Sequence, residues 1–171
     1  MIKIGQGVTM SGQRGTYMSK KSVSEAAVKR PWCMITDMDQ YLFGEGTHYE
    51  IYKKLGAHPT EYNGEQGVYF AVWAPHAKGV RVVGEFNCWG NDGYPMKRLD
   101  PLGIYEVFIP GLREGSMYKY LIETESGDYL YKADPFASYA EKRPGTASRV
   151  ADISQFIWHD ERWMEKRKTW N

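Results

Sequence analysis

The residues best suited to hold a ligand are aromatic, basic and amide side chains near the ends of predicted strands. Trp89 follows a strand pattern and stands between Asn87 and Asn91. Lys119 lies on the polar face of a later strand, and Tyr129 follows a turn. Indole and phenol rings offer flat apolar surface to a sugar ring, while ammonium and amide groups hydrogen-bond its hydroxyls. These residues indicate a carbohydrate-binding platform; the alternative is that Trp89 covers the end of the strands as a packed residue.

The sequence carries no recognisable pattern for catalysis, a cofactor or a metal. The glycines of residues 5–15 neither follow a strand nor open a helix, so they do not form a phosphate-binding loop. Cys88 has no neighbouring base that would activate it, and the four histidines lack ligand spacing. Glycoside hydrolysis needs two converging carboxylates, and the sequence does not show convergence for any pair of the available acids. The acids considered are Glu85, Asp92, Asp100 and Asp134. We therefore predict a chain without catalytic activity, cofactor or metal.

The composition indicates which partners and which cellular compartment to expect. A net charge of +1 over 171 residues argues against binding to nucleic acid, which usually leaves a clear basic excess. Cys33 and Cys88 are the only cysteines, as expected for a reducing compartment. No apolar run is long enough to cross a membrane, and no signal-peptide core follows the N-terminus. We expect a cytoplasmic protein with no nucleic-acid or membrane partner.

The middle of the chain has the hydrophobic period of two that is typical of β-strands. Turn signals such as Asn63-Gly64 and Pro110-Gly111 separate the runs. The predicted strands cover residues 68–74, 80–86, 104–109, 118–124, 129–131 and 149–153. Many short strands without helices between them predict an all-β fold, an antiparallel β-sandwich. The Cys–Trp–Cys spacing of antibody domains is absent, so any immunoglobulin-like character is one of architecture.

Short helices are predicted on both sides of the strands. Thr47 and Glu50 have the spacing of a capping box, so one helix is expected to begin there and to end at Gly56. Asp160 is the expected N-cap of a second helix within residues 158–168. The predicted division is a basic extension over residues 1–36, a capped helical segment that packs on the sandwich over 37–60, the sandwich over 61–155 and a linker over 156–171. The extension is expected to be flexible or derived from expression, with a basic interaction tail as the alternative.

Several blocks of this sequence closely resemble the N-terminal part of 1,4-α-glucan (glycogen) branching enzymes over residues 37–171. These blocks are DQYLFGEGTHY (39–49), KLGAH (54–58), GVYFAVWAPHA (67–77), VGEFNCW (83–89), ADPFA (133–137) and RPGTAS (143–148). The VGEFNxW pattern alone fits the wider carbohydrate-binding module family 48, which isoamylases and glycogen-sensing kinase subunits share. The YLFxEGTHY pattern is narrower and points to branching enzymes.

The resemblance implies an immunoglobulin-like β-sandwich that precedes a catalytic (β/α)₈ barrel. None of the barrel's motifs is found in this sequence. The chain is therefore expected to be the non-catalytic N-terminal module of an enzyme that cuts an α-1,4 glucan and transfers the segment to a 6-hydroxyl. Residues 156–171 would lead toward the barrel, and the expected partners are α-glucan (glycogen or maltooligosaccharides) and that barrel.

By the same resemblance, the glucan-binding positions are Trp89, Lys119, Tyr129, Thr146 and Ser148. Tyr129 stands where the glycogen-sensing subunits have Trp, which keeps a stacking ring of smaller area. Ser148 stands where they have Asn. Two alternatives stay open: a purely structural docking module without glycan affinity, and the N-terminal module of a related isoamylase-type debranching enzyme.

Overall fold

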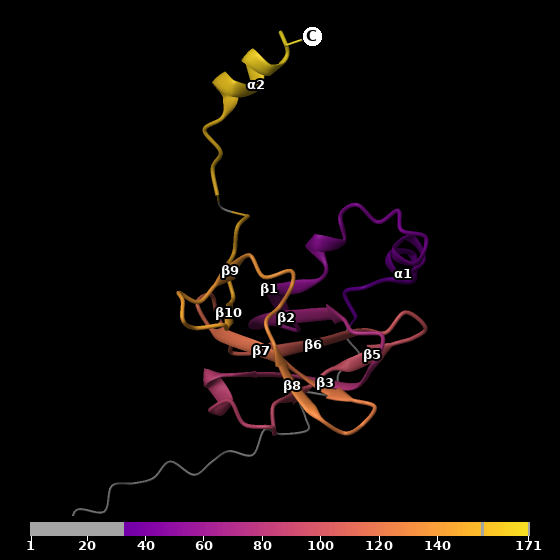
Figure 1. Ribbon diagram of the computed structural model, residues 1–171. Coiled ribbons are helices and arrows are strands. Elements are labelled where there is room, and N and C mark those ends of the chain that lie inside the picture. The colour runs from indigo at the N-terminus through magenta and orange to yellow at the C-terminus, as the bar shows by residue number, and fades with distance from the viewer. Residues whose placement is uncertain (1–32, 155, 171) are drawn as a thin grey trace, which may run out of the picture.

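The strands form two antiparallel sheets packed face to face. The computed structural model describes residues 33–154 and 156–170 (Figure 1). The first sheet has the order β1-β2-β6-β5: β1 (Gly56–Tyr62), β2 (Glu65–Trp73), β6 (Ile104–Pro110) and β5 (Lys97–Leu99). The second has the order β4-β3-β7-β10-β9, with β8 also paired to β7. Its strands are β4 (Tyr94–Pro95), β3 (Ala77–Gly84), β7 (Met117–Thr124), β8 (Tyr129–Lys132), β9 (Tyr139–Ala140) and β10 (Ser148–Arg149). The predicted all-β, immunoglobulin-like sandwich is confirmed.

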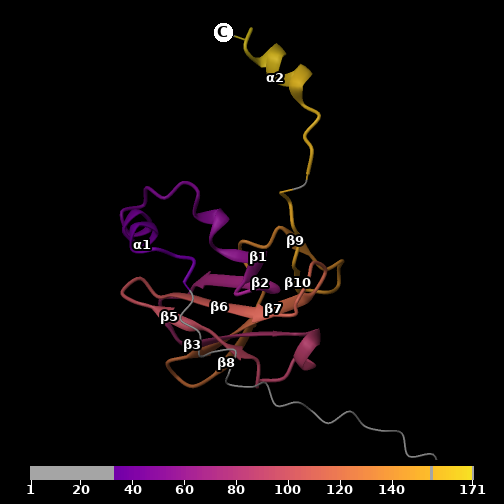
Figure 2. The ribbon, with the colours of Figure 1, turned by 180° about the vertical axis from the view of Figure 1, so that it is seen from behind.

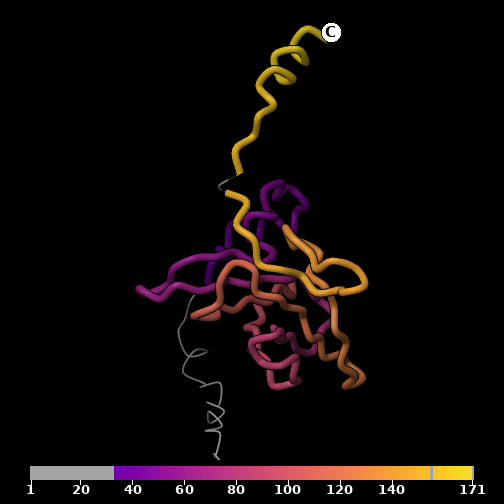
Figure 3. The backbone as a smooth tube through the Cα atoms, turned by 90° about the vertical axis from the view of Figure 1, so that its left-hand side faces the viewer, coloured from indigo at the N-terminus to yellow at the C-terminus, as the bar shows by residue number. Residues whose placement is uncertain are grey.

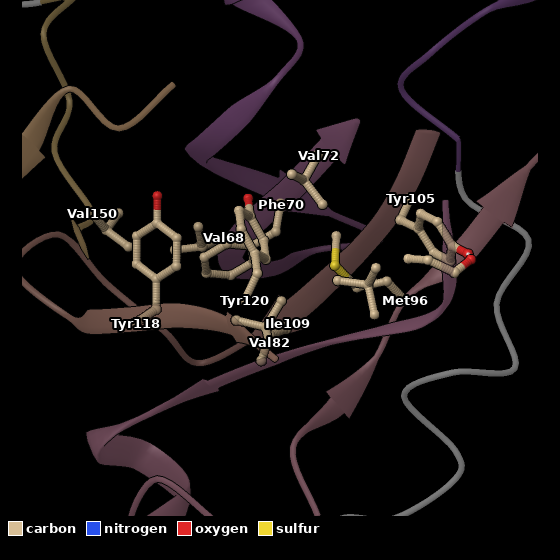
Figure 4. Packing of buried hydrophobic residues seen from close by; sticks show 12 residues of the cluster. Val68, Phe70, Val72, Val82, Met96, Tyr105, Ile109, Tyr118, Tyr120 and Val150 are labelled. Carbon is tan, nitrogen blue, oxygen red and sulfur yellow. The ribbon is translucent and has the colours of Figure 1, made fainter. Parts of the chain in front are cut away.

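The main core lies between the two sheets. Val68, Phe70 and Val72 alternate along β2 and meet Tyr118 and Tyr120 from β7 (Figure 4). Phe70 and Tyr118 make an edge-to-face contact with ring centroids 4.9 Å apart. Such aromatic pairs are stabilising beyond the apolar area that they bury. The period of two on β2 therefore predicts the core-facing residues correctly.

The outer face of the first sheet is buried as well. Tyr69 and Ala71, which alternate with the core residues of β2, are both 0% exposed. Ile35 and Leu55 cover them and complete a second hydrophobic cluster. Sequence alternation alone predicts a solvent-facing side for such a strand, and here residues from before the sandwich occupy that side.

A buried carboxylate fastens the segment before the first helix to this face. Glu106 on β6 is 2% exposed, and its Oε2 accepts hydrogen bonds from the Tyr69 hydroxyl (2.9 Å) and the Met34 N–H (3.2 Å). Lys54 Nζ donates to the Met34 carbonyl at 3.0 Å. Because these bonds join residues far apart in the chain, residues 33–36 form a strap across β2 and β6.

The first helix lies earlier than the sequence predicts. Helix α1 spans Asp37–Gly44, and its capping box is made by Thr36 and Asp39. The expected helix from Thr47 to Gly56 is wrong: only one 3₁₀ turn, η2 (Ile51–Lys53), forms there. Gly56 has φ of +108° and begins β1 instead of ending a helix. Both Thr-x-x-acid patterns meet the local rule, and tertiary packing decides between them.

The Thr47-His48 segment is held by α1. His48 Nε2 lies 2.8 Å from Asp39 Oδ1, and Lys54 Nζ lies 3.5 Å from Asp39 Oδ2. Partial burial of Asp39 raises the pKa of its carboxyl, but the hydrogen bonds from His48 and Thr36 and the Lys54 charge outweigh it and leave that pKa below its usual range. The sharp turn after α1 therefore depends on an ionised Asp39. Figure 2 shows α1 and this turn on the side of the first sheet.

The hydrophobic period of two does not predict some of the short strands. β1 contains Pro59 and lacks alternating hydrophobic residues, and β4, β5 and β9 have two or three residues each. The expected strand over 149–153 is wrong in extent, because β10 contains only Ser148–Arg149. The expected boundary between residues 60 and 61 falls inside β1. Most of the expected 1–36 extension, up to residue 32, lies outside the described residues.

The C-terminal segment projects away from the sheets. Helix α2 (Glu161–Arg167) follows Asp160 as its N-cap, at the predicted position, and buries none of its residues. Figures 1 and 3 show residues 156–170 leading away from the sandwich. Neither described helix is long and apolar enough to cross a membrane.

The strap provides a test of the second cluster. Replacing Ile35 with alanine should lower the free energy of unfolding by about 2–4 kcal/mol, because it leaves a cavity against β2 and β6. Met38 on α1 is 64% exposed. Met38→Ala should therefore change the free energy of unfolding by about 0.5 kcal/mol or less. Urea unfolding followed by tryptophan fluorescence measures both. Equal effects of the two substitutions would show that the strap is not part of the core.

Candidate functional site

A tight turn after β3 presents Trp89. The turn begins with the 3₁₀ segment η3 (Glu85–Asn87), after which Cys88 and Trp89 both have left-handed backbone, with φ of +54° and +59°. Non-glycine residues in this conformation cost about 1–3 kcal/mol each. Asn87 offsets part of that cost: its Oδ1 accepts the Gly84 N–H at 2.8 Å, and its Nδ2 donates to the Gly90 carbonyl at 3.0 Å. Asn87 is thus a brace of the turn.

Lys119 and Thr146 join Trp89 from two other parts of the chain. Lys119 lies on β7 opposite Val83 of β3, next to the turn. Its Nζ stands 5.7 Å from the Trp89 ring centroid and donates to Thr146 Oγ1 at 2.8 Å. We name Trp89, Lys119 and Thr146 the platform. The structure therefore brings together three of the five residues predicted from sequence.

Tyr129 lies further from the platform than expected. In the β7–β8 register Tyr129 is opposite Glu123, whereas Tyr131 is opposite Leu121. Lys119, Leu121 and Glu123 share one face of β7. The site of Tyr131 is therefore nearer to Lys119 than that of Tyr129, by about 7 Å along the strand. Both tyrosine side chains are partly exposed, at 47% for Tyr129 and 44% for Tyr131.

Tyr131 is the tyrosine that contacts the Trp89 turn. Its hydroxyl proton is directed at Asn91 Oδ1, 2.6 Å away, and at the Trp89 carbonyl, 3.1 Å away. The sequence shows two tyrosines with period two after a turn, but the register of β8 on β7 is a tertiary property. The signal for Tyr131 is present in the sequence, yet nothing local selects it over Tyr129.

Ser148 faces the interior. It is 2% exposed, pairs with Tyr118 across β7 and β10, and its Oγ accepts a hydrogen bond from the Asp134 N–H at 2.8 Å. Asp134 is 6% exposed, and its Oδ2 accepts from the hydroxyls of Tyr118 (2.6 Å) and Tyr120 (3.1 Å). In this conformation Ser148 supports a buried polar network and does not line the platform.

The buried network shifts the pKa of Asp134. Burial raises it, and the hydrogen bonds from Tyr118, the Phe136 N–H and Tyr120 offset only part of that effect. Burial, together with the Asp134 charge, also raises the pKa values of the Tyr118 and Tyr120 hydroxyls. Asp134 was one of the four acids weighed for catalysis, and its position between the sheets keeps it from solvent.

The platform has the chemistry of a binding surface. The half-buried Trp89 ring offers an apolar face, the Lys119 ammonium can donate further hydrogen bonds, and the Thr146 hydroxyl can donate and accept. Among the described residues no group of three or more His, Cys, Asp or Glu side chains is placed to hold a metal ion. The arrangement suits a neutral ligand that has flat apolar faces and many hydroxyls.

Comparison with known proteins points to a class of binding module. A family model described as carbohydrate-binding module 48 (isoamylase N-terminal domain) matches residues 54–137, which are 84 of the 171 residues of this chain. The match includes Trp89, Lys119, Tyr129 and Tyr131; Thr146 and Ser148 lie beyond it.

The individual relatives are mostly much longer proteins. A 1,4-alpha-glucan branching enzyme GlgB from Butyrivibrio fibrisolvens is 54% identical over 134 residues, which are 78% of this chain and 21% of that protein. A protein of the same name from Synechococcus sp. (strain JA-3-3Ab) is 52% identical over 133 residues, 78% of this chain and 17% of that protein. The chain thus spans about a fifth of the length of these relatives. Among solved structures, a pullulanase from Bacillus acidopullulyticus covers 58% of this chain and 12% of its own, with 22% identity and a TM-score of 0.47.

Tyr131 and Tyr129 form a matched pair for testing the brace on the Trp89 turn. Tyr131→Phe should speed amide hydrogen exchange of Trp89 and Gly90 by about fivefold, since a hydrogen bond of about 1 kcal/mol is lost. Tyr129→Phe should leave these rates unchanged, because no bond from its hydroxyl to the turn is seen. Exchange is followed by NMR. Unaltered rates in Tyr131→Phe would contradict the brace.

Asp134 should make stability fall as pH rises. The unfolded carboxyl ionises around 3.8, and the folded one only at higher pH. Between these values the native state holds the extra proton, so the wild type should lose stability relative to Asp134→Asn as pH increases from 3.8 through the raised pKa. Urea unfolding of both proteins at several pH values gives the difference. A difference that stays constant over that range would contradict the raised pKa.

Proposed function

We propose that this chain is the non-catalytic, α-glucan-binding N-terminal module of a 1,4-α-glucan branching enzyme that acts in glycogen biosynthesis. The single observation that carries the proposal is the platform, in which Lys119 joins the Trp89 ring and the Thr146 hydroxyl on one exposed surface. The match to the module family and identities of 52–54% to branching enzymes support it.

Binding would proceed by stacking and hydrogen bonding. An apolar face of a glucose residue packs on the Trp89 ring, and its hydroxyls replace water around Lys119 Nζ and Thr146 Oγ1. The Asn87 and Tyr131 hydrogen bonds hold the turn in place before the ligand arrives. A preformed surface loses little conformational entropy on binding, which raises affinity. Tyr129, predicted as a second stacking residue, would serve a longer chain that extends along β8.

The catalytic steps belong to the remainder of the proposed parent enzyme. That enzyme would cleave an α-1,4 glucan and transfer the segment to a 6-hydroxyl through a covalent glycosyl-enzyme. The module would hold the polymer close to the barrel. Cys33 and Cys88 are free thiols, which supports the proposed cytoplasmic location.

A docking role is the second candidate, and the C-terminal segment favours it. Ile157 and Trp158 are 71% and 70% exposed, and Trp163 on α2 is 50% exposed. Apolar residues gathered in this way mark a surface that another protein surface covers. The segment would then dock on the barrel of the same polypeptide. An isoamylase-type debranching enzyme as parent has the weaker support, since the pullulanase is only 22% identical.

Glycogen affinity electrophoresis separates the candidates. The wild type should be retarded in glycogen-loaded gels, and Trp89→Ala should be retarded clearly less because the stacking surface of the platform is gone. Trp158→Ala is the matched control, an exposed indole outside the platform, and should stay retarded. Normal migration of the wild type would exclude glucan binding by this chain and leave the docking role, which predicts affinity for a separately expressed barrel that Trp158→Ala weakens.

A further inference from the structure

A second recess lies at the edge of the sandwich, where segments that flank both sheets meet. It is a cleft of about 750 Å³ between η2, the start of β1, the loop before β9 and the residues after β10. The platform, by contrast, is built on β3 and β7 of the second sheet. In Figure 1 the purple segment before β1 and the magenta turn after β3 lie on opposite sides of the sheets. The cleft and the platform are therefore separate surfaces.

The walls of this cleft are held by internal hydrogen bonds. Phe136 is fixed by its N–H, which donates to Asp134 Oδ1 at 2.8 Å. His58 Nε2 lies 3.0 Å from the Leu55 carbonyl, and its ring stacks on Tyr69. On the far wall the Ser154 N–H donates to Asp152 Oδ1 at 2.8 Å. The cleft thus exists before any ligand enters, as small-molecule sites usually do.

The lining combines exposed rings with polar groups and carries little net charge. Tyr52 and Phe136 are 53% and 37% exposed and offer apolar ring surface. Lys53 is paired with Glu50, so its charge is balanced. The Ser138 hydroxyl has no hydrogen-bond partner among the described residues and is free to bind. Rings for stacking, hydroxyls at the rim and balanced charge suit a neutral polyhydroxylated ligand better than an anion, a cation or an apolar peptide.

We propose that this cleft is a second α-glucan-binding site, with Tyr52 and Phe136 as its stacking residues and Ser138 as a hydrogen-bonding group. The ligand class rests on the proposed function, whereas the site does not use the platform. Two separate sites hold two glucan branches, or two stretches of one long chain. Binding at one raises the effective concentration at the other for a polymer but not for a short oligosaccharide.

The test is an NMR titration of the ¹⁵N-labelled chain with maltoheptaose. Backbone amides of Tyr52, Ser138 and Ser154 should shift with saturation in the wild type and equally in Trp89→Ala. Tyr52→Ala should weaken the affinity read from these amides by about 2- to 10-fold, the loss expected for one stacking contact. Tyr49→Ala is the matched control, because Tyr49 is 86% exposed and outside the cleft. Ser138→Trp, which fills the cleft, should abolish the shifts.

Each result decides between the two sites. Shifts confined to the Trp89 turn would overturn the second site and leave the proposed function intact. Cleft shifts without any response at Trp89 would support the second site and remove the platform. Equal affinities in Tyr52→Ala and Tyr49→Ala would also overturn it, and a chain that shows no shifts at all excludes both sites and points to a protein partner for the cleft.

Discussion

The alternation of side chains along β7 connects the core of the sandwich to its candidate binding surface. Tyr118 and Tyr120 point inward to the main cluster, and Lys119 between them points outward to Trp89. Pairing with β3 sets Lys119 opposite Val83 and so beside the turn that follows β3. A slip of one residue would bury the lysine and expose the tyrosines, so the register is strongly constrained by the cost of burying an ammonium group. The same register that packs the core therefore also places Lys119 beside Trp89.

Two tyrosines of the same strand hold a buried carboxyl group, that of Asp134. A carboxylate between two sheets is tolerated only when its oxygens are hydrogen-bonded. Asp134 receives the hydroxyls of Tyr118 and Tyr120 on one oxygen and the Phe136 N–H on the other. One buried group thereby holds the loop that lines the cleft. Through β7 and Asp134, the two surfaces share a single rigid core while their ligand contacts remain separate.

The chain has two kinds of exposed surface, one that combines polar and aromatic residues and one that is mainly apolar. The platform and the cleft have polar and aromatic residues together, arranged by backbone hydrogen bonds and by the left-handed residues Cys88 and Trp89. The C-terminal segment instead exposes large apolar residues on a helix that buries none of them. Exposed apolar surface of this kind is stable in water only at a cost, which contact with another protein surface would remove. The proposed glucan binding and the proposed docking would therefore use different parts of the chain.

The sequence alone determined the fold class, and it predicted the residues that meet in the platform. Alternation in β2, β6 and β7 specified the inner faces, because a strand's side chains point to opposite sides with a period of two. It also singled out Trp89 and Lys119, whose types and positions at strand ends are local properties. Local rules could not choose between the capping patterns at Thr36 and Thr47, and the strap that Ile35 anchors has no periodic signal. Only the tertiary structure decided that Tyr131 and not Tyr129 meets the turn, and that Ser148 faces inward, because strand register is set by contacts between residues distant in the chain.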